Sequence, residues 1–193
     1  MNNTTHHSPL TAHQRKKAIF LDRDGVINVE KEYVYKIEEF EFIDGLFETL
    51  KKFQELGYFL FIITNQSGIG RGYYSINDFN VLTTWMLKEF EKEGITISQV
   101  EFCPHSPEQI CQCRKPKTGM IDAILKNFDI DLEHSWLIGD KDADIQCAKN
   151  AHIKNTIQVK SGHKFDEAQS QADYVCESIV ECFEVMKIVS GEW

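Results

Sequence analysis

The stretch Phe20–Asn28, FLDRDGVIN, is the most informative part of this sequence. An apolar run, Ala18–Leu21, ends at Asp22, and Asp24 and Gly25 follow it. Open α/β sheets bind ligands at the carboxyl ends of their strands, so a strand end of this kind is a natural site for chemistry. Two carboxylates one residue apart repel each other unless a cation or proton lies between them, and Mg²⁺ prefers such oxygen ligands. Taken alone, the pair is equally compatible with a solvated acidic turn.

The hydrophobic pattern of the whole chain alternates between strand and helix signals, which is typical of βαβ units around a parallel sheet. After the first strand we predict strands at 58–63, 100–102, 136–138 and 156–159. Helices are predicted from a cap at Asp44 to Gly57, from a capping box at Ser75 and Asp78 to Gly94, and at 120–128, 145–151 and 178–189. The expected fold class is therefore α/β, with a flexible arm over residues 1–16 and a single domain over 17–193.

Composition narrows the possible partners. The chain has 193 residues, with 21 Lys and Arg against 30 Asp and Glu, and a formal net charge of −9. An acidic surface argues against nucleic acid or an anionic membrane as the main partner. No apolar run approaches membrane-spanning length, the polar start is unlike a signal peptide, and the six cysteines are expected to be reduced. We therefore expect a cytoplasmic, monomeric protein that acts on a small molecule.

Polar side chains also follow the other predicted strands. Hydroxyl, amide and loop N–H groups in TNQSGIGRG, residues 64–72, could hold phosphate oxygens, although an ordinary glycine-rich turn would look similar. The segments CRKPK, 113–117, and IGDKDADI, 138–145, supply cations and further carboxylates. Because parallel strands end at one edge of a sheet, these groups are expected to converge on the acidic pair. The groups in question are Thr64, Asn65, Gln66, Arg114, Lys115, Asp140 and Asp144.

This set of residues predicts phosphoryl transfer. Asp22 can attack phosphorus and form an aspartyl-phosphate, while Asp24 protonates the leaving oxygen and later takes a proton from water. Mg²⁺ would be held by Asp22, Asp140 and the main-chain carbonyl of Asp24. Lys115 and Thr64 would donate to the phosphoryl oxygens. Asp144 is expected to hold either Lys115 or a metal-bound water.

The motifs DRDG, TNQ, RKPK and GDKDAD stand in the order found in the haloacid dehalogenase (HAD) superfamily of phosphatases, which this sequence resembles over roughly residues 17–160. The resemblance implies a Rossmann-like fold, an Asp nucleophile, an Asp acid/base and Mg²⁺. The segment between Asp22 and Thr64 carries a predicted helix and is too short for a large cap domain. An open site is therefore expected, in which loops select the substrate.

A cysteine-rich loop, CPHSPEQICQC, follows the third predicted strand. Cys103, His105, Cys111 and Cys113 make the three-thiolate, one-imidazole set of a structural zinc site, although small buried cysteines and a surface histidine would be the alternative. With all four positions filled by protein, this Zn²⁺ would fix the loop carrying Arg114 and Lys115. The other cysteines are expected in the core. The other histidines show no ligand spacing and are expected to be exposed or satisfied: His6, His7, His13, His134, His152 and His163.

Within the superfamily, three segments are similar to the heptose 1,7-bisphosphate 7-phosphatase family: INVEKEYVYKIEEFEFIDG, TNQSGIGRGYYS and CRKPKTGM. This resemblance implies removal of the C7 phosphate of a sugar bisphosphate in nucleotide-activated heptose and lipopolysaccharide synthesis. It implies a substrate loop of Glu30, Lys31, Glu32 and Tyr33, a phosphate site of Thr64, Asn65, Gln66 and Ser67, and contacts from Arg114 and Lys115 to the two phosphates. Glu32 stands where the family usually has Gly.

Two alternatives remain open from the sequence. The five-residue spacer between His105 and Cys111 is also like that of histidinol-phosphate phosphatases. A phospho-acceptor signalling domain also uses carboxylates at strand ends, Mg²⁺, a hydroxyl and a lysine, but it would retain its phospho-aspartate and would not need Asp24 as an acid.

Overall fold

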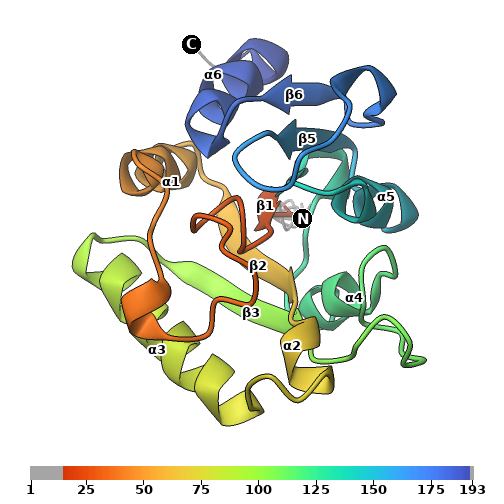
Figure 1. Cartoon of the computed structure of the whole chain (residues 1–193). Helices are drawn as coiled ribbons and strands as arrows, with labels where there is room; N and C mark the ends of the chain where they lie inside the picture. Colours follow the sequence, from red (N-terminus) through yellow and green to blue (C-terminus); the bar gives the residue numbers. More distant parts are fainter. Residues whose placement is uncertain (1–14, 192–193) are drawn as a thin grey trace, which may run out of the picture.

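A six-stranded parallel sheet forms the centre of the molecule, with strand order β3-β2-β1-β4-β5-β6 (Figure 1). The structure is a computed structural model and describes residues 15–191. This order is the doubly wound Rossmann arrangement, so the predicted α/β class is confirmed. The strands are β1 (Ala18–Leu21), β2 (Phe59–Asn65), β3 (Ile97–Cys103), β4 (Trp136–Gly139), β5 (Asn155–Val159) and β6 (Tyr174–Cys176).

The helices agree with the sequence pattern at most positions. They are α1 (Leu46–Glu55), α2 (Ser67–Gly70), α3 (Ile76–Lys92), α4 (Gly119–Leu125), α5 (Asp142–Asn150) and α6 (Ile179–Ser190), with short 3₁₀ turns at Ile37–Glu39, Leu132–His134 and Glu167–Gln169. The capping box at the start of α3 is confirmed, because Ser75 Oγ accepts from the Asp78 amide and Asp78 accepts from the Ser75 amide.

Several local expectations were wrong. The N-cap of α1 is Gly45 rather than Asp44, because the chain enters this helix through a left-handed residue with φ of 79°, a conformation that favours glycine. Strand β3 is longer than the predicted 100–102, and α5 starts earlier than 145, at Asp142. The sequence pattern missed β6, which is three residues long, and α2, which is four.

The sheet is buried on both faces, which explains why its strands read as continuous apolar runs. Along β1, Ile19 and Leu21 face a core made with α1, α3 and α6, whereas Ala18 and Phe20 face a second core made with α4 and α5. Figure 1 shows these two helix layers on opposite sides of the sheet. Within residues 15–191, no helix has the length and apolar character needed to cross a membrane.

The ends of the described chain add two observations. Most of the predicted flexible arm lies outside the described residues, as do His6, His7 and His13. Lys16, which was assigned to that arm, pairs with Ile130 through a bridge in which its amide donates to Asp129 O at 3.2 Å. Cys147, Cys176 and Cys182 are buried, as expected.

Candidate active site

The ends of the two central strands bring the predicted carboxylates together. Strands β1 and β4 are neighbours, and the Asp22 amide donates to Ile138 O at 3.0 Å. Asp22 therefore lies beside Asp140, the residue that follows β4, and Asp144 reaches the same point from the first turn of α5. One oxygen from each of these three buried carboxylates lies within 4.8 Å of the others. The convergence expected from the strand ends is thus present in the fold.

Lys115 is the cation inside this group. Its side chain is 1% exposed, and its Nζ lies 2.9 Å from Asp22 Oδ1 and 2.6 Å from Asp144 Oδ1. Nζ also donates to Ile63 O at 2.8 Å. Burial opposes the charged form, but Asp144 and Asp22 outweigh it and hold the pKa of Lys115 above its ordinary value. Lys115 is therefore a permanently charged donor beside Asp22, and of the two alternatives for Asp144 the structure shows the ion pair with Lys115.

The carboxylates still carry more negative charge than the protein neutralises. Burial raises the pKa of Asp22; Lys115 opposes this rise and Asp144 adds to it. Burial, followed by the charge of Asp22, also raises the pKa of Asp140. Asp140 Oδ1 is buried and has no hydrogen-bond partner among the described residues. A hard divalent cation such as Mg²⁺ fits this set, because it would give the unpartnered oxygen a ligand bond and offset the clustered charge.

Asp24 has a different environment from Asp22. Arg23 donates to Asp24 Oδ1 from Nε at 3.2 Å and from Nη2 at 2.8 Å, and Asn28 Nδ2 donates to the same oxygen at 3.1 Å. Gln66 Nε2 donates to Oδ2 at 3.1 Å. Burial acts to raise the pKa of Asp24, but Arg23 and these hydrogen bonds hold it below its ordinary value. The side chain of Asp24 is thus oriented separately from the three clustered carboxylates.

Gln66 connects Asp24 to the rest of the site. Its Nε2 also donates to Thr64 Oγ1 at 2.9 Å, and its Oε1 accepts from the Tyr74 hydroxyl at 2.5 Å. Burial raises the pKa of Tyr74 to about 12, so this hydroxyl stays protonated and donates. The Tyr74 ring packs directly on Gly68, where an added Cβ would lie 2.2 Å from Tyr74 Cε1. Gly68 is therefore required by close packing, a reason that the motif alone did not reveal.

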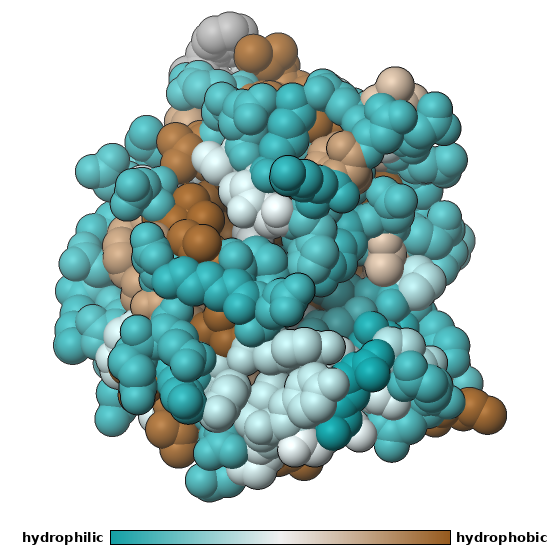
Figure 2. All heavy atoms as spheres, viewed as in Figure 1, coloured by the Kyte–Doolittle hydropathy of each residue, from teal (hydrophilic) through white to brown (hydrophobic). Residues whose placement is uncertain are grey.

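A polar cleft of about 260 Å³ opens above these residues. Figure 2 shows that this face of the molecule is covered mainly by hydrophilic residues. Glu32 and Tyr33, in the loop after β1, both have left-handed backbone conformations, with φ of 53° and 52°. The observed conformation explains why a glycine would suit position 32. The cleft is lined by Asp24, Glu30, Glu32, Tyr33, Asn65, Gln66, Ser67, Tyr74, Lys141 and His163.

Two side chains that were expected to contact the substrate do not line the cleft in this structure. Lys31 Nζ pairs with Glu41 at 2.8 Å, and Arg114 Nη1 donates to His105 O at 3.3 Å. Asn65 both lines the cleft and braces the following motif, because its Oδ1 accepts from the Lys115 amide at 3.0 Å. The basic side chains in the cleft lining are instead Lys141 and His163.

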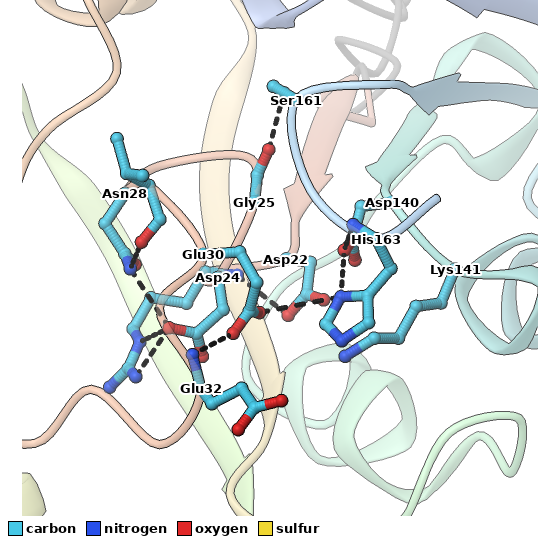
Figure 3. Close-up of polar contacts among 12 residues, drawn as sticks. Asp22, Asp24, Gly25, Asn28, Glu30, Glu32, Asp140, Lys141, Ser161 and His163 are labelled. Atoms are coloured by element: carbon cyan, nitrogen blue, oxygen red, sulfur yellow. Dashed lines mark hydrogen bonds and ion pairs between the residues drawn. The ribbon is translucent and has the colours of Figure 1, made fainter. Parts of the chain in front are cut away.

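His163, like Tyr74, is a site residue that sequence reasoning missed. It was expected to be exposed or satisfied and without a role, since it has no ligand spacing to another histidine. Its side chain is indeed 44% exposed, but Nδ1 lies 2.8 Å from Asp140 Oδ2 (Figure 3). Its position after a strand, in the segment SGH that follows β5, is the one sequence signal that could have pointed to it.

The cysteine-rich loop brings its four candidate ligands to one point. Cys103 Sγ lies 3.1 Å from Cys113 Sγ, 3.7 Å from Cys111 Sγ and 3.5 Å from His105 Nδ1. Thiolates around a tetrahedral Zn²⁺ lie roughly 3.8 Å apart, so only a small expansion is needed. Burial raises the pKa of Cys103 to about 12, so a thiolate here needs a nearby positive charge. The set is compatible with Zn²⁺.

Comparisons with known proteins identify the family of this chain. A family model described as "HAD-hyrolase-like" matches residues 112–182. The chain is 44% identical over 179 residues to D-glycero-beta-D-manno-heptose-1,7-bisphosphate 7-phosphatase of Pasteurella multocida, covering 89% of this chain and 97% of the relative. The chain belongs to the heptose-1,7-bisphosphate 7-phosphatase family. The resemblance to HAD phosphatases is thereby confirmed.

Two further members support the assignment. The D-glycero-alpha-D-manno-heptose-1,7-bisphosphate 7-phosphatase of Campylobacter jejuni is 51% identical over 150 residues, which is 78% of this chain and 86% of the relative. The crystal structure of D,D-heptose 1,7-bisphosphate phosphatase from B. bronchiseptica, complexed with magnesium and phosphate, is 26% identical with a TM-score of 0.78. That match covers 91% of this chain and 99% of the other. Family members are phosphatases, so this chain is a phosphoric monoester hydrolase.

Proposed function

We propose that this protein removes the C7 phosphate of D-glycero-D-manno-heptose 1,7-bisphosphate and leaves heptose 1-phosphate. Membership of the heptose-bisphosphate phosphatase family supports the substrate. The observation that carries the chemistry is the buried group formed by Asp22, Asp140, Asp144 and Lys115 at the adjacent ends of β1 and β4. The product would serve the synthesis of nucleotide-activated heptose for surface glycans.

Asp22 is the proposed nucleophile. Its Oδ1 is held by the Arg23 amide at 2.7 Å and by Lys115 Nζ at 2.9 Å, so rotation of the carboxylate is restricted. Attack on the C7 phosphorus forms an aspartyl-phosphate and breaks the bond to the leaving sugar oxygen. Thr64 donates to the phosphoryl oxygens, an interaction that lowers the barrier. Lys115 joins it when attack by Asp22 frees the N–H that points to that carboxylate, because the other two N–H groups bond Asp144 and Ile63 O.

Asp24 is the proposed acid and base. Its carboxyl group would give a proton to the sugar oxygen in the first step. In the second step it would take a proton from the water that attacks the aspartyl-phosphate, which breaks the bond between phosphorus and Asp22 and releases inorganic phosphate. The pKa of Asp24 is held low by Arg23 and its hydrogen bonds, so the protonated form must arise when the anionic substrate enters the cleft. Gln66, fixed in turn by Tyr74, bonds both Asp24 and Thr64 and would keep this carboxyl group beside the proposed phosphate site.

Two metals complete the proposed site. Mg²⁺ would be held by Asp22, Asp140 and the main-chain carbonyl of Asp24, and when bound it would screen Asp22 from the phosphate and stabilise transition-state charge. Zn²⁺ would be held by Cys103, His105, Cys111 and Cys113 and would have a structural role. It would fix the loop that ends at Arg114 and Lys115.

The open cleft is the proposed place for the sugar. Glu30, Glu32 and Tyr33 would approach it from one side, and Asn65, Gln66 and Ser67 from the base. Lys31 and Arg114 would have to leave their present partners to reach a second phosphate. Arg114 suits that role because its guanidinium binds phosphate in a bidentate way.

We also expect this reaction to occur in the cytoplasm and to need no second subunit. None of the six cysteines is in a disulfide, and a zinc site of three cysteines favours a reducing compartment, where thiols stay unoxidised. Gel filtration would test the monomer, and metal analysis would test the zinc.

Steady-state phosphate release from a substrate panel tests the proposed function. The panel contains both anomers of heptose 1,7-bisphosphate, histidinol phosphate and p-nitrophenyl phosphate. We expect a heptose bisphosphate to give the highest kcat/KM. A higher value for histidinol phosphate would refute the substrate, and a stable phosphorylated protein without turnover would instead indicate a phospho-acceptor domain.

A further inference from the structure

The loop between β5 and β6 folds back over the active site. Its residues Ser161, Gly162 and His163 follow the end of β5, and His163 lies directly beside Asp140 (Figure 3). The motifs of the predicted site end at Asp144, so this loop belongs to a part of the chain to which those motifs assign no function. Its contacts nevertheless reach a candidate magnesium ligand.

His163 holds one oxygen of the Asp140 carboxylate. Both its main-chain amide and its ring Nδ1 lie 2.8 Å from Asp140 Oδ2. An ionised carboxylate only accepts hydrogen bonds, so it is matched in this contact by the tautomer of the ring that carries a proton on Nδ1. The other oxygen, Oδ1, is buried and has no partner among the described residues. The two oxygens of Asp140 are thus differentiated, and only one is engaged by protein.

The loop itself is fixed to the segment that carries Asp22 and Asp24. Ser161 Oγ donates to Gly25 O at 2.6 Å. A Cβ added at Gly162 would lie 2.2 Å from Asp140 Oδ2, and one added at Gly25 would lie 2.7 Å from Gly162 Cα. Glycine at both positions therefore permits the backbone of the loop to approach Asp140 and the turn after β1 closely.

We infer that Ser161, Gly162 and His163 position Asp140 so that Oδ2 is held by protein and Oδ1 remains available to bind Mg²⁺. His163 acts through Asp140 and is a positioning residue. Hydrogen-bond partners of metal ligands fix the orientation of those ligands, and their loss typically weakens metal binding by about 10–100-fold. The inference rests on the proposed magnesium site and is independent of which phosphate ester is the substrate.

Magnesium-dependent thermal stabilisation, measured without substrate, tests this role. The full-length protein is depleted of magnesium by dialysis, and its melting temperature is followed as magnesium chloride is added. His163→Ala removes the ring donor and retains the main-chain amide, whereas His163→Asn replaces the ring donor with a side-chain N–H. His134→Ala is the matched control, because His134 is exposed and pairs with Asp131 away from the cleft.

We expect the magnesium concentration at half-maximal stabilisation to rise about tenfold or more in His163→Ala. His163→Asn should recover most of that loss, and His134→Ala should match the parent protein. Ser161→Ala, which removes one hydrogen bond and adds no bulk, should shift the midpoint in the same direction by a smaller factor.

The outcomes distinguish a failure of the positioning role of His163 from a failure of the proposed function. A normal magnesium response in the parent protein together with an unchanged midpoint in His163→Ala overturns the positioning role alone. If Asn at position 163 were no better than Ala, the side-chain hydrogen bond would not be the cause, and the inference would again fail. A parent protein that shows no magnesium response refutes the magnesium site and this role with it, whereas failure on heptose bisphosphate with a normal response affects only the proposed substrate.

Discussion

Replacing Lys115 with methionine should destabilise the protein strongly at neutral pH. Lys115 lies between Asp22 and Asp144, with Nζ 2.9 Å and 2.6 Å from their carboxylates and a side chain that is 1% exposed. Methionine has a similar length and keeps most of the apolar contacts of the lysine stem. The substitution therefore removes the charge and the hydrogen bonds while leaving little empty volume.

The expected magnitude follows from this burial. Removing one partner of a buried ion pair costs about 3–5 kcal/mol, because the remaining charge is left without compensation. For a domain of this size each kcal/mol lowers Tm by about 2–4 °C, so we expect a fall of roughly 6–20 °C. The pKa of Asp22 is already raised by burial, and loss of Lys115 raises it further. When a carboxyl group has a raised pKa in the folded state, the folded protein becomes less stable as pH rises and that group ionises. The stability deficit of Lys115→Met relative to the parent should therefore be larger at pH 8 than at pH 5.

Differential scanning calorimetry in magnesium-free buffer measures the effect, with urea unfolding as a second measurement. The double variant Lys115→Met/Asp144→Asn removes one positive and one negative charge and should regain at least half of the lost stability. It should not regain activity, because the proposed Nζ donor to the phosphoryl group is still missing. Lys141→Met is the matched control, since Lys141 is exposed and the same substitution there should change stability by less than about 0.5 kcal/mol.

Two results would refute this reasoning. A melting temperature for Lys115→Met within 2–3 °C of the parent at pH 8, on the scale of about 1 kcal/mol, would show that the buried carboxylates do not depend on Lys115. A double variant less stable than Lys115→Met would show that charge balance is not the cause.

The other predictions concern the nucleophile, the zinc loop and the packing of the cleft. Asp22→Asn should lower turnover by a factor on the order of 10³ or more, because it removes the proposed nucleophile. It should also raise Tm in magnesium-free buffer at pH 7, because it removes a buried carboxylate with a raised pKa, and a lower Tm would contradict this. Cys111→Ser should lower both bound zinc, measured by elemental analysis, and Tm, and a parent protein without zinc after chelator-free purification would refute the zinc site. Gly68→Ala should displace the Tyr74 ring, cost about 1–3 kcal/mol in urea unfolding and lower kcat/KM, whereas an unchanged urea midpoint would show that the ring yields freely.

The parts of the site that the sequence predicted are those set by local order along the chain. Asp22 follows an apolar strand directly, and a parallel sheet places all such strand ends at one edge. The zinc candidates lie within eleven consecutive residues, 103–113, so their convergence needs only one loop. Local pattern was less reliable at element ends, where Gly45 rather than Asp44 begins α1 because a left-handed turn precedes the helix.

The parts that the sequence missed depend on contacts between distant segments. Arg114 follows Cys113 in the chain, but its guanidinium donates to His105 O rather than lining the cleft. In the sequence Gly68 is one of several glycines in a loop, and only the structure shows the Tyr74 ring packed against it. Neither the direction of the Arg114 guanidinium nor the position of the Tyr74 ring against Gly68 is encoded by residue type or spacing, because each depends on what the rest of the fold places nearby.

The sequence by itself therefore determined the α/β class, the acidic centre at the end of the first strand and the chemical type of the reaction, because strand periodicity and residue type are local properties. Only the tertiary structure decided how the charges are shared: Lys115 pairs with both Asp22 and Asp144, while His163 contacts one oxygen of Asp140 and the other oxygen has no partner among the described residues. These assignments depend on distances between residues far apart in the chain. Such distances arise from the order in which the strands pair and from the close approach of backbone at Gly25 and Gly162.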